Sequence, residues 1–185
     1  MSIKKSEIHL AQVRGAELIK KSGIYMTNKE LNTIEIADFG LSNLSNEGLE
    51  ILIYENNSRY CAKELAMFPR QTCPEHRHPP VSKTNPGKQE TFRVRWGKVF
   101  LYVDGPATPG IPQARLPKGS EAYYTVRHEV ILNPGEQYTI PPNTKHWFQA
   151  GDEGAVVSEF SSTSTDEFDA FTDPRIKRIP EILED

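Results

Sequence analysis

Short segments in which apolar and polar residues alternate, separated by Pro- and Gly-rich stretches, make up most of this chain. Since successive side chains of a β-strand point to opposite faces, each alternating segment predicts a strand with one buried face. Many short strands between turn residues favour an all-β sandwich or barrel. The predicted strands cover residues 34–36, 49–54, 60–68, 90–96, 98–103, 123–132, 137–140 and 155–160, with two more around His76 and His146.

The first part of the chain follows a helical pattern instead. Apolar residues between Ile8 and Ile19 recur on one side of a helix, basic residues follow in its last turn, and Gly23 suits the position after its C-terminus. We expect this helix to pack on the outside of the barrel or on a partner subunit. Thr27 and Glu30 then have the spacing of a capping box, which predicts one further helical turn.

Length and charge limit the range of functions. A chain of 185 residues fits one domain that buries a sizeable core. A net charge of −3 offers no basic surface for nucleic acid. No apolar run approaches the length of a membrane span, and the first residues lack the apolar core of a signal peptide. We therefore expect no nucleic-acid or membrane partner and a cytoplasmic location.

The two cysteines, Cys61 and Cys73, imply no disulfide framework and are expected to be reduced core residues. Within one domain the pattern predicts three parts. These are an N-terminal helix with its connecting segment (1–45), a barrel (46–165) and a polar C-terminal strap (166–185) that crosses the barrel mouth or reaches a neighbouring subunit.

Three histidines and one glutamate carry the strongest chemical signal. His76 and His78 are two residues apart, so both imidazoles project to the same side if this stretch is extended. Glu90 follows after a loop rich in Pro and Gly, and His146 lies after a Pro-Pro turn. Three imidazoles and a carboxylate are a ligand set for a divalent metal of intermediate hardness, and they leave positions for substrate or water.

Glu90 stands on a strand face that is otherwise apolar. By the strand period Phe92, Val94 and Trp96 share this face with it. Since an isolated buried charge is costly, the Glu90 carboxylate calls for a positively charged partner.

The spacing of these residues resembles the two motifs of the cupin family, which implies a double-stranded β-helix, or jelly-roll, barrel. Eleven residues separate His78 from Glu90, more than in the commonest cupin pattern, and a lengthened loop costs little free energy. The matching residues are His76, His78, Glu90 and Gly97 in the first motif and Gly135, Pro141, Pro142 and His146 in the second.

Two further polar residues lie on predicted strands near this cluster. If the face that carries Cys61 and Leu65 is inside, Lys63 enters the core on the strand before the histidine pair. The pattern alone favours the alternative, a Lys63 that reaches water at an edge of the sheet. Glu159 likewise faces either the pocket or the solvent by pattern alone.

A narrower resemblance rests on these two residues and on the end of the chain. Lys63 thirteen residues before His76, Glu159 on the strand after His146, and the closing run Asp173-Pro174-Arg175-x-x-Arg178-x-Pro180 look like the D-lyxose isomerase family of cupin sugar isomerases. The resemblance covers the chain from about residue 50 onward. It implies a homodimer with one divalent ion per chain, Mn²⁺ foremost, with Fe²⁺, Co²⁺ and Zn²⁺ as other candidates.

That family interconverts aldoses and ketoses, typically D-lyxose with D-xylulose and D-mannose with D-fructose. The resemblance thus implies a small-molecule sugar substrate for a ketol-isomerase. As a hypothesis, Glu159 moves the proton between C1 and C2, and Lys63 donates a hydrogen bond to the sugar oxygen where charge develops. If a hydride shifts instead, the same residues would move hydroxyl protons.

Other functions stay open on the sequence. A phosphosugar isomerase would need donors for a phosphate, and Arg93 and Arg95 lie by period on the face opposite Glu90. A cupin dioxygenase would use Fe²⁺ with a similar ligand set. A non-catalytic, metal-dependent sugar-binding cupin would give Lys63 and Glu159 no reason to face the pocket.

Overall fold

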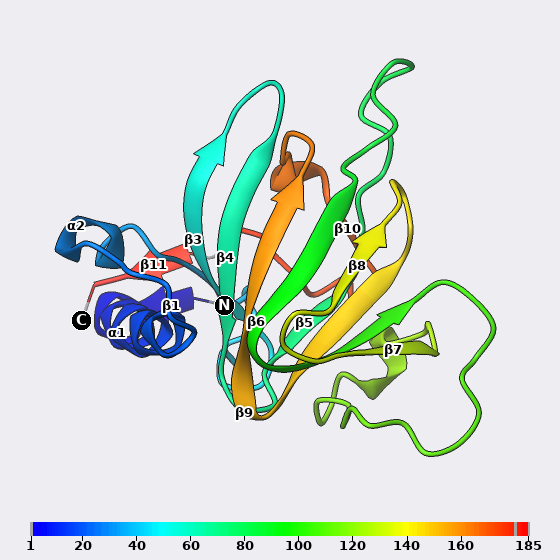
Figure 1. Cartoon of the computed structure of the whole chain (residues 1–185), viewed down its shortest axis with the longest axis horizontal. Helices are drawn as coiled ribbons and strands as arrows, with labels where there is room; N and C mark the ends of the chain where they lie inside the picture. Colours follow the sequence, from blue (N-terminus) through cyan, green and yellow to red (C-terminus); the bar gives the residue numbers. More distant parts are fainter. Residues whose placement is uncertain (1, 180, 185) are drawn as a thin grey trace.

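One strongly curled β-sheet forms most of the computed structural model, which describes residues 2–179 and 181–184 (Figure 1). Its 9 strands include one continuous path of hydrogen-bonded neighbours in the order β10-β5-β9-β4-β3-β2, and β6 pairs with β7, β8 and β9. The strands are β2 (Glu35–Ala37), β3 (Leu49–Asn56), β4 (Cys61–Met67), β5 (Thr72–Arg77), β6 (Glu90–Val103), β7 (His128–Leu132), β8 (Gln137–Ile140), β9 (His146–Ser161) and β10 (Ala170–Phe171).

The remaining elements lie outside this sheet. Helices α1 (Lys5–Lys21) and α2 (Asn28–Leu31) confirm the two predicted helical segments, and Thr27 and Glu30 form the expected capping box. The strands β1 (Ser2–Lys4) and β11 (Glu181–Leu183) pair in parallel beside α1 (Figure 1). Two 3₁₀ turns, η1 (Glu121–Tyr123) and η2 (Asp166–Phe168), complete the list.

Two long bent strands close the barrel. β6 pairs with β9 from Glu90 opposite Ser161 to Val103 opposite His146. The predictions of separate strands at 90–96 and 98–103, and of separate strands around His146 and at 155–160, are therefore wrong. Each pair is one strand with a bend in it.

Gly97 allows this bend without ending the strand. Its φ of +74° lies in the left-handed region, and a Cβ there would lie 2.1 Å from the Gly154 carbonyl oxygen. The register shifts on both sides of it. Between Val94 and Trp96, β6 has one extra residue, as in a β-bulge, and between Gly97 and Val99 the partner on β9 moves from Ala155 to Ala150. Trp96 consequently leaves the face of Glu90, contrary to prediction, and packs against the cluster beneath α1.

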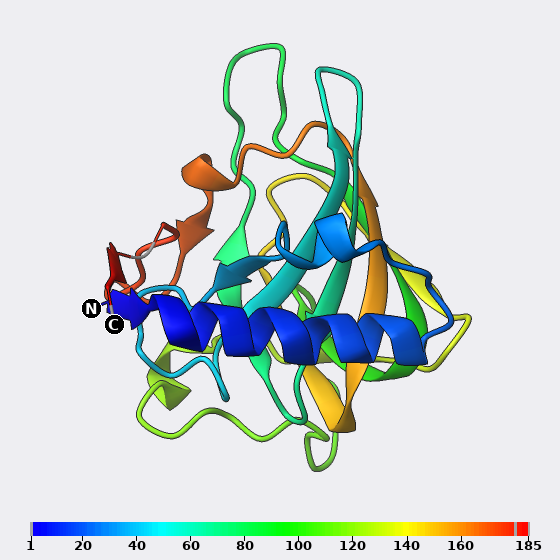
Figure 2. The same cartoon turned by 90° about the vertical axis from the view of Figure 1, so that its left-hand side faces the viewer.

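Alternate side chains of β3, β4 and β9 enter two different cores. Ile51, Leu65 and Val157 belong to the barrel interior. Their neighbours Leu52 and Ala66 belong to a second cluster, which α1 covers from outside the barrel (Figure 2). Burial on both faces explains the nearly continuous apolar run at the start of β3, and the position of α1 outside the barrel confirms the prediction.

The predicted strand at 123–132 is wrong in its first half, since only His128–Leu132 pairs as β7. The backbone N–H groups of Thr125 and Val126 donate to the carboxylate of Glu75 instead of to a neighbouring strand. A side chain thus satisfies backbone donors that a sheet would otherwise pair. No helix in residues 2–179 and 181–184 is long and apolar enough to cross a membrane.

Candidate metal centre and active site

The four predicted ligands converge inside the barrel. His76 lies near the end of β5, His78 directly after it, Glu90 at the start of β6 and His146 at the start of β9, and His76 pairs across the sheet with His146. One nitrogen or oxygen atom from each lies within 4.8 Å of the other three, and all four residues are buried.

Hydrogen bonds orient each imidazole in the same way. Nδ1 of His76 donates to the Pro74 carbonyl at 2.8 Å, and Nδ1 of His146 donates to the Thr144 carbonyl at 2.9 Å. Nδ1 of His78 donates to the Asp169 carboxylate at 2.5 Å. Since these oxygens accept hydrogen bonds only, each Nδ1 carries a hydrogen and each Nε2 is available as a metal ligand.

The Nε2 atoms of His78 and His146 both lie close to one carboxylate oxygen. Oε1 of Glu90 lies 3.2 Å from His78 Nε2 and 2.9 Å from His146 Nε2. Among the described residues, the buried Nε2 of His146 has no hydrogen-bond partner. Such an orphaned atom is unusual in a protein interior, and a divalent cation bound by these groups would satisfy it. The residues therefore fit a metal ion.

Burial and charge set the protonation of these groups. Burial, aided by the neighbouring imidazoles, holds the pKa of His76 well below its usual range, which favours the neutral form that binds metals. For His78, burial opposes protonation but the Glu90 carboxylate outweighs it, and the pKa rises to about 9. A metal ion would therefore compete with a proton at His78.

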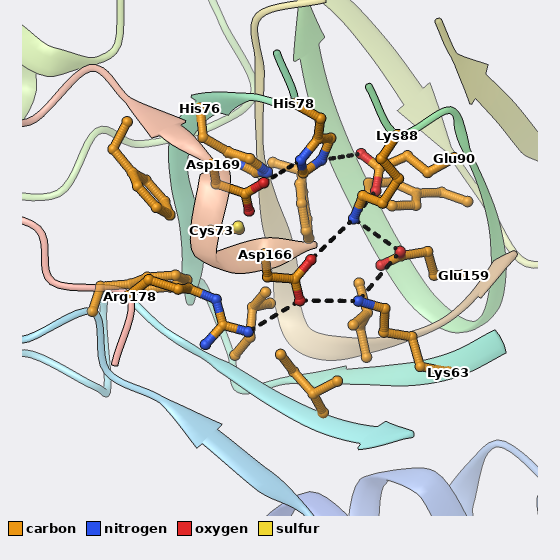
Figure 3. Close-up of a pocket in the computed structure, with 17 residues that line it drawn as sticks. Lys63, Cys73, His76, His78, Lys88, Glu90, Glu159, Asp166, Asp169 and Arg178 are labelled. Carbon is orange, nitrogen blue, oxygen red and sulfur yellow. Dashed lines mark hydrogen bonds and ion pairs between the residues drawn. The ribbon is translucent and has the colours of Figure 1, made fainter. Parts of the chain in front are cut away.

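A second polar cluster lies beside the first (Figure 3). Two lysines face one oxygen of Glu159, with Lys63 Nζ 3.5 Å and Lys88 Nζ 3.1 Å from Oε1. Lys88 Nζ also lies 2.8 Å from Oε2 of Glu90, so it joins the two carboxylates. Asp166 closes the cluster, with Oδ2 3.4 Å from Lys63 Nζ.

Each charge in this second cluster has a partner. Burial disfavours the charged form of Lys88, but Glu159 and Glu90 outweigh it and hold its pKa well above the usual range. For Glu90, burial raises the pKa, whereas Lys88 and His78 lower it further, so the carboxylate is ionised. Lys88 is thus the positively charged partner that the apolar surroundings of Glu90 required.

Five of the six predicted site residues line one pocket, and the sixth, His146, is fully buried and belongs to the same group of candidate ligands. Lys63 and Glu159, whose directions the pattern left open, both point inward and are 3% exposed. Arg93 and Arg95 do not line the pocket, as predicted. An apolar wall completes it, formed by Phe39, Leu49, Ile51, Leu65, Phe92, Phe148 and Phe171.

Sequence reasoning missed four charged residues of the pocket. Lys88 carried a readable signal, because it precedes Glu90 by two residues and so shares its side of an extended chain. Its neighbour Gly87 has φ +100°, and a Cβ there would lie 2.2 Å from the His78 carbonyl oxygen, so the loop turns tightly against the histidine pair. The other three come from the C-terminal segment and are Asp166, Asp169 and Arg178.

Comparison with solved structures shows the fold. The L-ribose isomerase of Acinetobacter sp. DL28, solved in complex with L-ribose, superposes with a TM-score of 0.82, covers 98% of each chain and shares 18% sequence identity. The L-ribose isomerase of Cellulomonas parahominis superposes with a TM-score of 0.80 over 98% of this chain and 99% of its own. The curled sheet with its central group of histidines and glutamate defines a cupin-fold protein.

Sequence relatives identify the family. A D-lyxose/D-mannose isomerase of Thermosediminibacter oceani is 65% identical over 180 residues, 97% of this chain and 98% of that protein. A D-lyxose ketol-isomerase of Cohnella laeviribosi is 64% identical over 93% of each chain. The family model described as D-lyxose isomerase matches residues 116–185. The chain belongs to the D-lyxose isomerase family, and it is a sugar aldose–ketose isomerase.

Family membership confirms the resemblance seen in the sequence and favours an isomerase over the dioxygenase and the non-catalytic sugar-binding protein. Of the closing run that carried part of that resemblance, Asp173 and Arg175 form an ion pair and Arg178 lines the pocket. Pro180 lies outside the described residues.

Proposed function

We propose that this chain interconverts D-lyxose with D-xylulose and D-mannose with D-fructose, using one divalent ion held by His76, His78, Glu90 and His146. The names of the relatives from T. oceani and C. laeviribosi support these sugars. The observation that carries the proposal is the position of Glu159, buried between two lysines beside the four candidate ligands. The family resemblance supports Mn²⁺ as the ion, and a donor set of three imidazoles and one carboxylate also suits Fe²⁺, Co²⁺ and Zn²⁺.

A divalent ion in this centre supplies Lewis-acid stabilisation for negative charge on the sugar oxygens. The isomerisation then needs a group that moves a proton between two adjacent carbons. Glu159 takes the proton from C2 of the open-chain aldose and returns it to C1, while the hydroxyl proton on O2 passes to O1, which gives the ketose. Lys63 and Lys88 hold this carboxylate in place beside the candidate metal centre.

The two lysines have different roles. Lys63 donates a hydrogen bond to the oxygen on which negative charge develops, and Lys88 holds the carboxylates of Glu90 and Glu159 in place. In a hydride shift between C1 and C2, Glu159 and Lys63 would instead move the hydroxyl protons.

Replacement of Glu159 tests this role. Glu159→Gln keeps the size of the side chain but removes its basicity, so turnover of D-mannose and D-lyxose should fall by about 10²-fold or more. Metal content, measured on the same protein by mass spectrometry, should stay at the wild-type level. Turnover within a few-fold of wild type would remove Glu159 from the reaction.

The state of the protein in the cell belongs to the same proposal. We assign a homodimer from the family resemblance and a cytoplasmic location from the two buried free cysteines, Cys61 and Cys73. The division into parts at 1–45, 46–165 and 166–185 is likewise proposed, with the last part reaching the pocket through Asp166 and Arg178.

A further inference from the structure

One of the three imidazoles differs from the others in what holds it. His76 and His146 each donate to a backbone carbonyl only two residues earlier in the chain. His78 donates to a side chain 91 residues away, the carboxylate of Asp169. The orientation of His78 therefore depends on the C-terminal segment, whereas the other two orientations are set locally.

The C-terminal segment is fixed to the same strand that carries the histidines. β10 pairs antiparallel with β5, which places Phe171 opposite His76 and Ala170 opposite Arg77. One residue further, Thr172 donates from its backbone N–H to the Glu75 carbonyl and from its hydroxyl to the Glu75 carboxylate. Asp169 immediately precedes this pairing, so its carboxylate is delivered to His78 in a fixed position.

The contact between Asp169 and His78 is a charged hydrogen bond out of solvent. The side chains are 8% and 6% exposed. A carboxylate acceptor strengthens the hydrogen bond and makes the opposite ring nitrogen a better electron donor than a carbonyl acceptor would. That opposite nitrogen is the Nε2 atom facing Glu90.

The same turn also reaches the lysine side of the pocket. Asp166, three residues before Asp169, pairs with Lys63, Lys88 and Arg178. The segment from Asp166 to Asp169 therefore contacts both halves of the site (Figure 3).

We propose that Asp169 is a positioning residue for the candidate metal ligand His78, and that through it the C-terminal segment sets the affinity of the centre for its ion. The inference rests on the proposed metal site. It assigns Asp169 no contact with the ion or the sugar. Removing a carboxylate that orients a ligating histidine typically weakens metal binding 10- to 100-fold.

Two substitutions of Asp169 distinguish the effect of its hydrogen-bond acceptor from the effect of its negative charge. Asp169→Ala removes the hydrogen-bond acceptor and should weaken Mn²⁺ binding about 10- to 100-fold. Asp169→Asn keeps a carbonyl that accepts from Nδ1 and loses only the charge, so it should recover part of that affinity. Glu167→Gln, at an exposed position of the same turn, is the matched control and should bind Mn²⁺ like wild type.

The measurement is isothermal titration of metal-free protein with Mn²⁺, with the thermal unfolding of each metal-free variant recorded beside it. The proposal is supported if Mn²⁺ affinity falls from wild type to Asp169→Asn and again to Asp169→Ala, while the unfolding temperatures stay within a few degrees of one another. Equal Mn²⁺ affinity in all three overturns it, and if the Ala variant fails to fold, an Asn variant with wild-type affinity overturns it alone. A wild-type protein that binds no Mn²⁺, Fe²⁺, Co²⁺ or Zn²⁺ would instead contradict the proposed function.

Discussion

Lysine is rarely buried, and this pocket buries two of them, Lys63 and Lys88, both less than 10% exposed. Lys88 is the more central, because its ammonium joins Glu90 of the candidate metal centre to Glu159 of the candidate proton-transfer site. Without it, two buried carboxylates would lose a common partner. The charged residues that line the pocket are Lys63, Lys88, Arg178, Glu90, Glu159, Asp166 and Asp169.

Removing the Lys88 ammonium should therefore cost both stability and activity. Breaking a buried ion pair on one side costs about 3–5 kcal/mol, and Lys88→Met should lower the free energy of unfolding by an amount of this order. Urea unfolding followed by circular dichroism measures it. Lys83→Met, on an exposed position of the same loop, serves as the control and should change the free energy of unfolding by less than ~0.5 kcal/mol. A similar small effect for both variants would contradict the central role of Lys88.

Site residues that lie two apart on an extended stretch could be predicted from the sequence. Site residues that a distant contact brings into the pocket could not. His76 and His78 share a side because they are two residues apart, and Lys88 stands in the same relation to Glu90, a signal that was present but overlooked. Asp169 sits in the tail beyond the last barrel strand, where no periodicity applies. Its place beside His78 follows only from the pairing of β10 with β5.

A fully buried carboxyl group lies outside the pocket, where helix α1 contacts the sheet. Glu50 on β3 lies against Gly15 of α1, fully buried, and its Oε2 has no hydrogen-bond partner among the described residues. Its other oxygen accepts from the Gln71 amide at 3.0 Å. Burial raises the pKa of Glu50 from 4.5 to about 8, so at neutral pH the carboxyl is protonated in the folded protein.

Stability should consequently fall as pH rises through this range. The unfolded chain releases the Glu50 proton near pH 4.5, while the folded protein retains it to about pH 8, so between these values folding takes up a proton. Glu50→Gln mimics the protonated form, so its folding needs no proton uptake at this position. The stability gain of this variant over wild type should be near zero at pH 4.5 and grow to about 4 kcal/mol at pH 8. A gain independent of pH would show that Glu50 ionises normally.

At the scale of the elements, the positions of strands were predictable and their continuity was not. A glycine after an alternating run reads as a stop, yet Gly97 bends β6 while pairing with β9 continues on both sides. The chain around Thr125 reads as a strand, yet the Glu75 carboxylate takes the hydrogen bonds that a strand neighbour would make. In both places, a contact with a residue distant in sequence determines whether the strand continues. The local pattern carries no information about that contact.

The whole molecule converges on the pocket. Side chains from β4, β5, β6 and β9 meet there with the loop before β6 and with the C-terminal segment, and the curled sheet encloses them (Figures 1 and 3). The all-β class was predictable from short alternating segments between turn residues, and the jelly-roll barrel from the resemblance to the cupin family. An ion bound by ligands from three strands should stabilise the fold as well as serve the reaction.

The central claim is that one divalent ion, held by His76, His78, Glu90 and His146, is required for the isomerisation of a sugar. Ketose formation from D-lyxose and D-mannose, assayed together with metal content before EDTA treatment, after it and after Mn²⁺ is restored, tests this claim directly. We expect one ion per chain, loss of activity when the ion is removed and return of activity with Mn²⁺. Full activity in protein shown to be free of metal would contradict it.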